Sequence, residues 1–147
     1  MNYLKDYDIC GWAVIDNMVA TKGTVFKPGS LTKEKYAKVP IIFGSIYDVG
    51  GTVGSALLET VDGGIYFYGI VTEPMLNMIH SGEIQTVSIH ANNIKRDVDR
   101  NVINGTIRAL ELVKYDEQPP EFQDTKIEKW KYDGKFFRRD ENELREI

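Results

Sequence analysis

The chain has little cysteine and histidine, and it lacks long apolar runs. Cys10 is the only cysteine among 147 residues, and there are two histidines. A single thiol excludes a framework of internal disulfides and suits a reducing cytoplasm. No apolar run approaches the roughly eighteen residues of a membrane helix, so no membrane partner is expected. The first residues have neither the basic nor the apolar stretch of a secretory signal, so none is expected.

Charge of either sign is also modest. The formal net charge is −4, and no basic run occurs without interspersed acidic residues. This pattern argues against a protein built to bind nucleic acid. Hydrophobic residues make up 42% and charged residues 27% of the chain, close to globular averages, which predicts a folded chain with a core of its own.

The motifs of metal and cofactor sites are missing as well. His80 and His90 lie on different predicted elements, and no cluster of His and Cys has zinc-ligand spacing. Asp97 and Asp99 lack the glycine and the final glutamate of a calcium loop. The stretch 44–54 holds four glycines, but no Gly-Lys-Ser/Thr follows them. The sequence therefore predicts no metal and no cofactor.

What is present is a succession of strand patterns. Alternating or short apolar runs predict strands over 8–16, 40–43, 52–59, 64–71 and 106–115, and a strand that carries Ser88 within the stretch 82–94. Two short helices are predicted, one over 31–37 after Ser30 and one after Thr72 that ends at Gly82. Together these indicate a mainly β (α+β) fold, a closed or nearly closed antiparallel β-barrel.

The residues after Pro120 look like an extension of that unit. We expect a β domain over 1–120 and a C-terminal extension over 121–147, with a hairpin that turns at Asp133-Gly134. The last residues, 140–147, are charged and are expected to fray or to form a short helix. An isolated hairpin is marginal in water, so its aromatic residues should lie against the main body or a partner. The candidate partner surface comprises Trp130, Tyr132, Phe136 and Phe137.

The most informative stretch is 82–94. Val87 and Ile89 alternate with polar residues, so Ser88 and His90 should project from one face of a strand. They are either a nucleophile and its base, or polar residues on the wet side of a sheet. The base would be His90 or His80. A contact between Ser88 and His90 would run along one strand and leave little room for a substrate carbonyl.

The order of several short motifs resembles the prohead (capsid maturation) protease family of tailed bacteriophages, whose fold is related to the herpesvirus assemblin proteases. The matching pieces extend from Gly11 to about Pro120. They are Val25-Phe26-Lys27-Pro28-Gly29-Ser30, Val39-Pro40-Ile41-Ile42-Phe43, Gly54, Asp62-Gly63-Gly64-Ile65-Tyr66, Ser81-Gly82-Glu83-Ile84-Gln85-Thr86-Val87-Ser88-Ile89, and Ala109-Leu110-Glu111-Leu112-Val113.

This resemblance assigns roles to residues one by one. Ser88 falls on the nucleophile and Glu111 on the acidic strand position, whereas Ser45 stands where the family has its catalytic histidine. Ile46 replaces the acidic neighbour of that histidine, and His90 replaces a glycine. A serine cannot accept the proton, and loss of one triad member removes most of the rate. The resemblance therefore implies the fold but not the activity.

Three hypotheses follow. The first is a catalytically degenerate head-assembly protein that binds the major capsid protein or the scaffold, located in the phage head or in the bacterial cytoplasm during assembly. The second is an active maturation protease that cuts scaffold or capsid protein with Ser88 and a displaced base, His90 or His80. The third is a β protein that shares only the fold. Self-association is compatible with all three.

Overall fold

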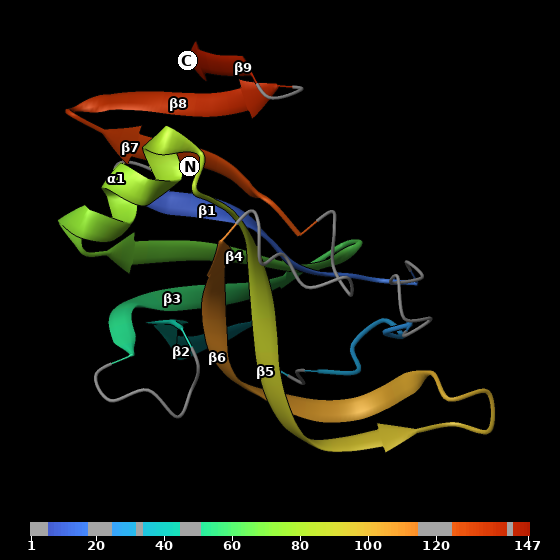
Figure 1. The fold of residues 1–147 in the computed structure, drawn as a ribbon. Coiled ribbons are helices and arrows are strands. Elements are labelled where there is room, and N and C mark those ends of the chain that lie inside the picture. The colour runs from blue at the N-terminus through green and yellow to red at the C-terminus, as the bar shows by residue number, and fades with distance from the viewer. Residues whose placement is uncertain (1–5, 18–24, 32–33, 45–50, 115–124, 141–142) are drawn as a thin grey trace.

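The computed structural model describes residues 6–17, 25–31, 34–44, 51–114, 125–140 and 143–147 (Figure 1). In these residues one helix, α1 (Glu73–Ser81), accompanies one mixed β-sheet. The strands are β1 (Ile9–Ile15), β2 (Tyr36–Phe43), β3 (Thr52–Val61), β4 (Gly64–Val71), β5 (Ile84–Arg96), β6 (Val102–Lys114), β7 (Ile127–Tyr132), β8 (Lys135–Asp140) and β9 (Glu143–Glu146). The predicted mainly β class is confirmed.

The strand order is β5-β6-β2-β3-β4-β1-β7-β8-β9. Neighbouring strands are antiparallel except β2 and β6, which run parallel with Ile41 beside Leu110. The expectation of purely antiparallel pairing is therefore wrong at this point. The sheet is not closed into a barrel, although an isolated bridge between Thr86 and Lys126 joins the start of β5 to the residue before β7.

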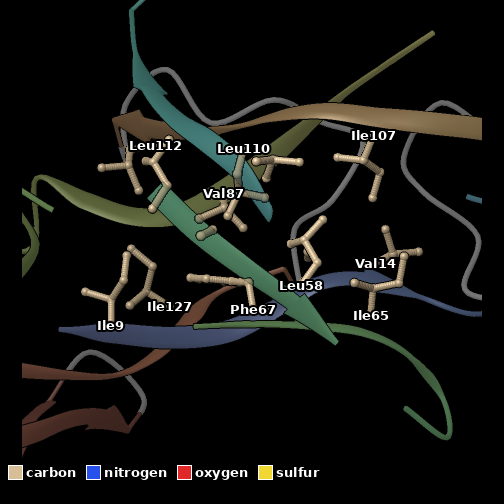
Figure 2. Close-up of a cluster of buried hydrophobic side chains, with 14 of the residues drawn as sticks. Ile9, Val14, Leu58, Ile65, Phe67, Val87, Ile107, Leu110, Leu112 and Ile127 are labelled. Carbon is tan, nitrogen blue, oxygen red and sulfur yellow. The ribbon is translucent and has the colours of Figure 1, made fainter. Parts of the chain in front are cut away.

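The sheet folds over a single main core. In Figure 2, side chains from β1 and β4, among them Ile9 and Phe67, face those of β5 and β6, among them Val87 and Leu110. All four side chains are at most 1% exposed. Successive side chains of a strand point to opposite sides of the sheet, so each strand contributes the side chains of one of its faces to this core. The far ends of β5 and β6 form an arm (Figure 1), and Val102 at the start of β6 still belongs to this core, beside Phe26.

The helix predicted after Thr72 is confirmed. Thr72 is extended before the first turn, Pro74 lies within that turn, and Gly82 ends the helix with a φ of 90°. This positive φ costs little at Gly82, because glycine has no Cβ to clash with the backbone. Met75 and Ile79 bury the apolar side of α1. None of the helical structure in the described ranges has the length and apolar character needed to cross a membrane.

The helix predicted over 31–37 is wrong in its described part. Residues 34 and 35 form bends, and Tyr36 begins β2, with Tyr36 opposite Glu59 of β3. Ladder bonds to β3 and burial of Val39 outweigh the local helix signal of Ser30 and the charged residues that follow it. Residues 32 and 33 lie outside the described residues.

The C-terminal hairpin belongs to the same sheet as the rest of the chain. β7 pairs with β1, so that Trp130 lies opposite Ile9. The boundary expected at residue 120 falls outside the described residues. The expected helix or frayed end after Asp140 is wrong for 143–146, because these residues form β9, with Leu144 opposite Arg139 of β8. Pairing with β8 satisfies the backbone groups that a frayed end would leave to water.

Candidate functional site

Ser88, His90 and Glu111 share one face of the β5–β6 ladder. Ser88 lies directly opposite Glu111, and His90 lies opposite Ala109. This face points away from the core, because Val87, the residue before Ser88, is 1% exposed and lies inside the core, and successive side chains of a strand point to opposite faces. His90 Nε2 and Glu111 Oε1 are 2.6 Å apart, with side chains 31% and 22% exposed. The sheet register therefore joins two of the predicted site residues.

The Ser88 hydroxyl is not joined to this pair. Among the described residues, His90 Nε2 bonds Glu111 and His80 Nδ1 bonds Trp130, and no hydrogen bond joins Ser88 to either imidazole. A carboxylate that holds an imidazole is the orienting half of a catalytic triad. The other half needs the base within hydrogen-bond reach of the nucleophile. The geometry thus supplies an oriented imidazole beside Ser88 but no formed dyad.

The strand that leads to Ser45 lies beside the same acid. Ile42 of β2 is the partner of Glu111, and Phe43 is the partner of Leu112. Ser45, two residues beyond Phe43, lies outside the described residues. The strand of Ser88 (β5), the strand of Glu111 (β6) and the strand that precedes Ser45 (β2) are therefore consecutive in the sheet.

His80 lies elsewhere, at the end of α1, in an aromatic cluster that we call the His80 cluster: His80, Trp130, Tyr132, Phe137 and Arg139. The indole N–H of Trp130 donates to His80 Nδ1 at 3.1 Å, and Tyr132 stacks on the imidazole at 3.9 Å between ring centroids. Phe137 meets the ring edge-on at 4.6 Å. Arg139 donates to the His80 carbonyl and lies over the indole of Trp130. These contacts commit His80 to packing rather than to Ser88.

The same contacts correct the predicted partner surface. Trp130 is 0% exposed, so it lies against the main body, one of its two expected positions, and does not belong to a partner surface. Tyr132 and Phe137 are half-buried against His80, and Phe136 packs on a second cluster formed around Cys10 and Tyr68. The aromatic residues of the hairpin therefore fasten it to the body of the molecule. Their burial is favourable because each covers a large apolar area.

The second cluster, on the opposite face of the sheet, contains the lone thiol. The Tyr66 hydroxyl donates to Glu128 Oε2 at 2.8 Å and lies 3.5 Å from Cys10 Sγ. Burial raises the pKa of the Cys10 thiol and also that of the Tyr66 phenol. Cys10 is 5% exposed and packs as a small apolar residue. In the described ranges, no group of three or more His, Cys, Asp or Glu is placed to hold a metal ion.

The His80 cluster predicts a pH-dependent stability. Burial, with the charge of Arg139, lowers the pKa of His80, and its Nδ1 must stay unprotonated to accept the Trp130 N–H. The unfolded chain, with a histidine pKa of about 6.5, then binds the proton more readily than the folded one. His80 therefore contributes fully above about pH 6.5, and this contribution is lost as the pH falls from there towards the lowered pKa.

Urea unfolding at pH 7.5 and pH 5.0 measures this effect. The wild-type chain should lose more free energy of unfolding between the two pH values than His80→Gln does, since glutamine does not titrate. Equal losses of the free energy of unfolding in the two proteins would show that the cluster does not disfavour protonation of His80.

Comparison of the chain with protein-family models, with curated proteins and with solved structures gives no match.

Proposed function

We propose that the chain is a head-assembly protein of a tailed bacteriophage, which binds the capsid or scaffold protein without cleaving it. The support is that the strands of Ser88 and Glu111 and the strand before Ser45 are neighbours in the sheet. The resemblance to prohead proteases needs the nucleophile strand, the acidic strand and the strand before the base side by side. β5, β6 and β2 are consecutive in the sheet, with Ser88 opposite Glu111.

The lack of cleavage rests on the base. Ser45 occupies the position of the family's histidine, and a hydroxyl does not accept a proton at neutral pH. His90 has its Nε2 engaged by Glu111 at 2.6 Å. A serine without a base in contact is a weak nucleophile. The likeness to the assemblin barrel belongs to the same proposal, and the Thr86–Lys126 bridge is the contact at which such a barrel would close.

One observation favours the second candidate, an active serine endopeptidase. With Glu111 accepting a proton-bearing Nε2, the other nitrogen of His90, Nδ1, is left as a free base. Ser88 lies two residues away on the same face. A small movement that brings Nδ1 to the Ser88 hydroxyl would complete a triad of Ser88, His90 and Glu111.

Assembly in the presence of the chain tests both candidates. The chain would be co-expressed with the major capsid and scaffold proteins of its own phage, as wild type, as Ser88→Ala and as the exposed control Ser55→Ala. We expect all three to sediment with assembled heads and to leave the mass of both head proteins unchanged. Processing that Ser88→Ala alone abolishes would establish the protease. Heads that form while the chain stays in the supernatant would overturn the binding function.

A further inference from the structure

A basic recess lies where the C-terminal hairpin meets the start of β5. It has a volume of about 430 Å³, and its charged lining is Lys126, Lys129, Arg138, Arg139, Glu128 and Asp140. Four cations and two carboxylates give the recess a surplus of two positive charges, whereas the whole chain has a net charge of −4. The recess therefore carries a positive net charge on a chain whose overall net charge is negative.

The two carboxylates of the recess are already occupied. The Tyr66 hydroxyl donates to Glu128 at 2.8 Å. Asp140 Oδ2 accepts from Arg138 Nε and Arg145 Nε, both at 3.2 Å. The side-chain ammonium groups of Lys126 and Lys129, by contrast, make no hydrogen bond or ion pair with another side chain that the structure describes. The surplus charge is thus located on side chains that are open to a ligand.

The sheet register concentrates this charge further. Lys129 lies directly opposite Arg138 on β8, and Arg138 lies directly opposite Arg145 on β9. Like charges at directly opposed positions of antiparallel strands destabilise a sheet. Asp140 offsets only the two arginines. A row of three cations that costs stability in the free chain is the arrangement expected of a site that receives an anion.

We propose that the basic recess binds the carboxylates of an acidic, extended segment of a protein partner; the identity of that partner as a head protein rests on the proposed function. Guanidinium groups bind carboxylates through paired hydrogen bonds. The cation row runs out to β9, and among the described residues β9 pairs only with β8. An extended peptide can add main-chain hydrogen bonds at such an edge, which a phosphate chain cannot.

Binding of a labelled peptide by fluorescence anisotropy tests the recess with the full chain. The probe is a hexapeptide of alternating Glu and Ser, compared with the same peptide carrying Gln in place of Glu. We expect the Glu peptide to bind and the Gln peptide to bind at least about tenfold more weakly, because the charge-assisted hydrogen bonds are lost. Binding of the Glu peptide should weaken as salt is raised.

Variants locate the site. Lys129→Gln with Arg138→Gln should weaken binding of the Glu peptide at least about tenfold, a loss typical of removing paired charges at a site. The matched control, Lys38→Gln with Lys135→Gln, removes the same two charges from exposed positions outside the recess and should change affinity less than about twofold. Circular dichroism melting checks that all variants remain folded.

Three results would overturn the recess: no binding of the Glu peptide, equal weakening by both double variants, or tighter binding of a ten-nucleotide oligothymidylate than of the peptide. The two proposals fail separately. If the chain sediments with heads but does not bind the peptide, the proposed function stands and the proposal of a peptide site in the recess is overturned. If the chain binds the peptide at Lys129 and Arg138 but does not sediment with heads, the peptide site stands and the proposed function is overturned.

Discussion

Replacing Trp130 by alanine is expected to lower the free energy of unfolding by about 3–5 kcal/mol, the usual cost of deleting a large aromatic side chain from a core. Trp130 is 0% exposed and lies against His80, Phe137 and Arg139. The substitution leaves a cavity and removes the donor to His80 Nδ1. It also loosens β7 from β1, where Trp130 is the partner of Ile9. Urea unfolding followed by circular dichroism gives the number.

The control separates volume from hydrogen bonding. Trp130→Phe keeps most of the ring area but removes the N–H that His80 accepts, so it should cost about 1–2 kcal/mol. Most of the loss in Trp130→Ala is then the cavity. A cost for Trp130→Ala below that of Trp130→Phe would contradict the burial of this residue in the core.

A single added methyl group at Gly11 is expected to cost at least about 3 kcal/mol, the upper end of the cost of overpacking. Gly11 lies on β1 between Phe67 of β4 and Ile127 of β7. A Cβ placed there would lie 2.2 Å from the backbone carbonyl oxygen of Lys126. Because that atom belongs to the main chain, the clash can be relieved only by moving β7 away from β1. Thermal melting of Gly11→Ala would show the loss.

Gly134→Ala provides the contrast. Gly134 lies in the β7–β8 turn with a φ of 73°, and a Cβ there would meet no heavy atom within 4 Å. Its substitution should cost about 1 kcal/mol, through backbone strain alone. If Gly11→Ala lowers the stability no more than Gly134→Ala does, then the absence of a side chain at Gly11 is not what allows β7 to lie close to β1.

Much of the fold could be predicted from local patterns. The turn at Asp62-Gly63 and the alternation on both sides of it predict the β3–β4 hairpin, and Asp133-Gly134 predicts the β7–β8 turn. Gly82 marks the end of α1. In these elements a turn residue and the periodicity that flanks it specify the same structure, so no distant contact is needed to decide between alternatives.

The rest depended on contacts between distant residues. The pair of His90 and Glu111 is set by the register of β5 on β6, which shifts at a bulge just after His90, and no local pattern predicts where such a shift falls. The sequence left open whether Trp130 packs on the main body or on a partner, because its environment is made by α1 and β1, far away in the sequence. The 31–37 helix failed for the same reason, since β3 recruits Tyr36 into a strand.

The pairing of β1 with β7 also constrains how the chain folds as it is synthesised. β1 is synthesised before the other strands of this sheet that the structure describes, whereas its partner β7, with the indole that packs beside it, follows only after β2 to β6. Until residues beyond Trp130 have left the ribosome, the nascent chain exposes an unpaired edge of β1 and an unfilled part of the core. We expect such intermediates to depend on chaperones and to fold slowly, as non-local pairing does in general.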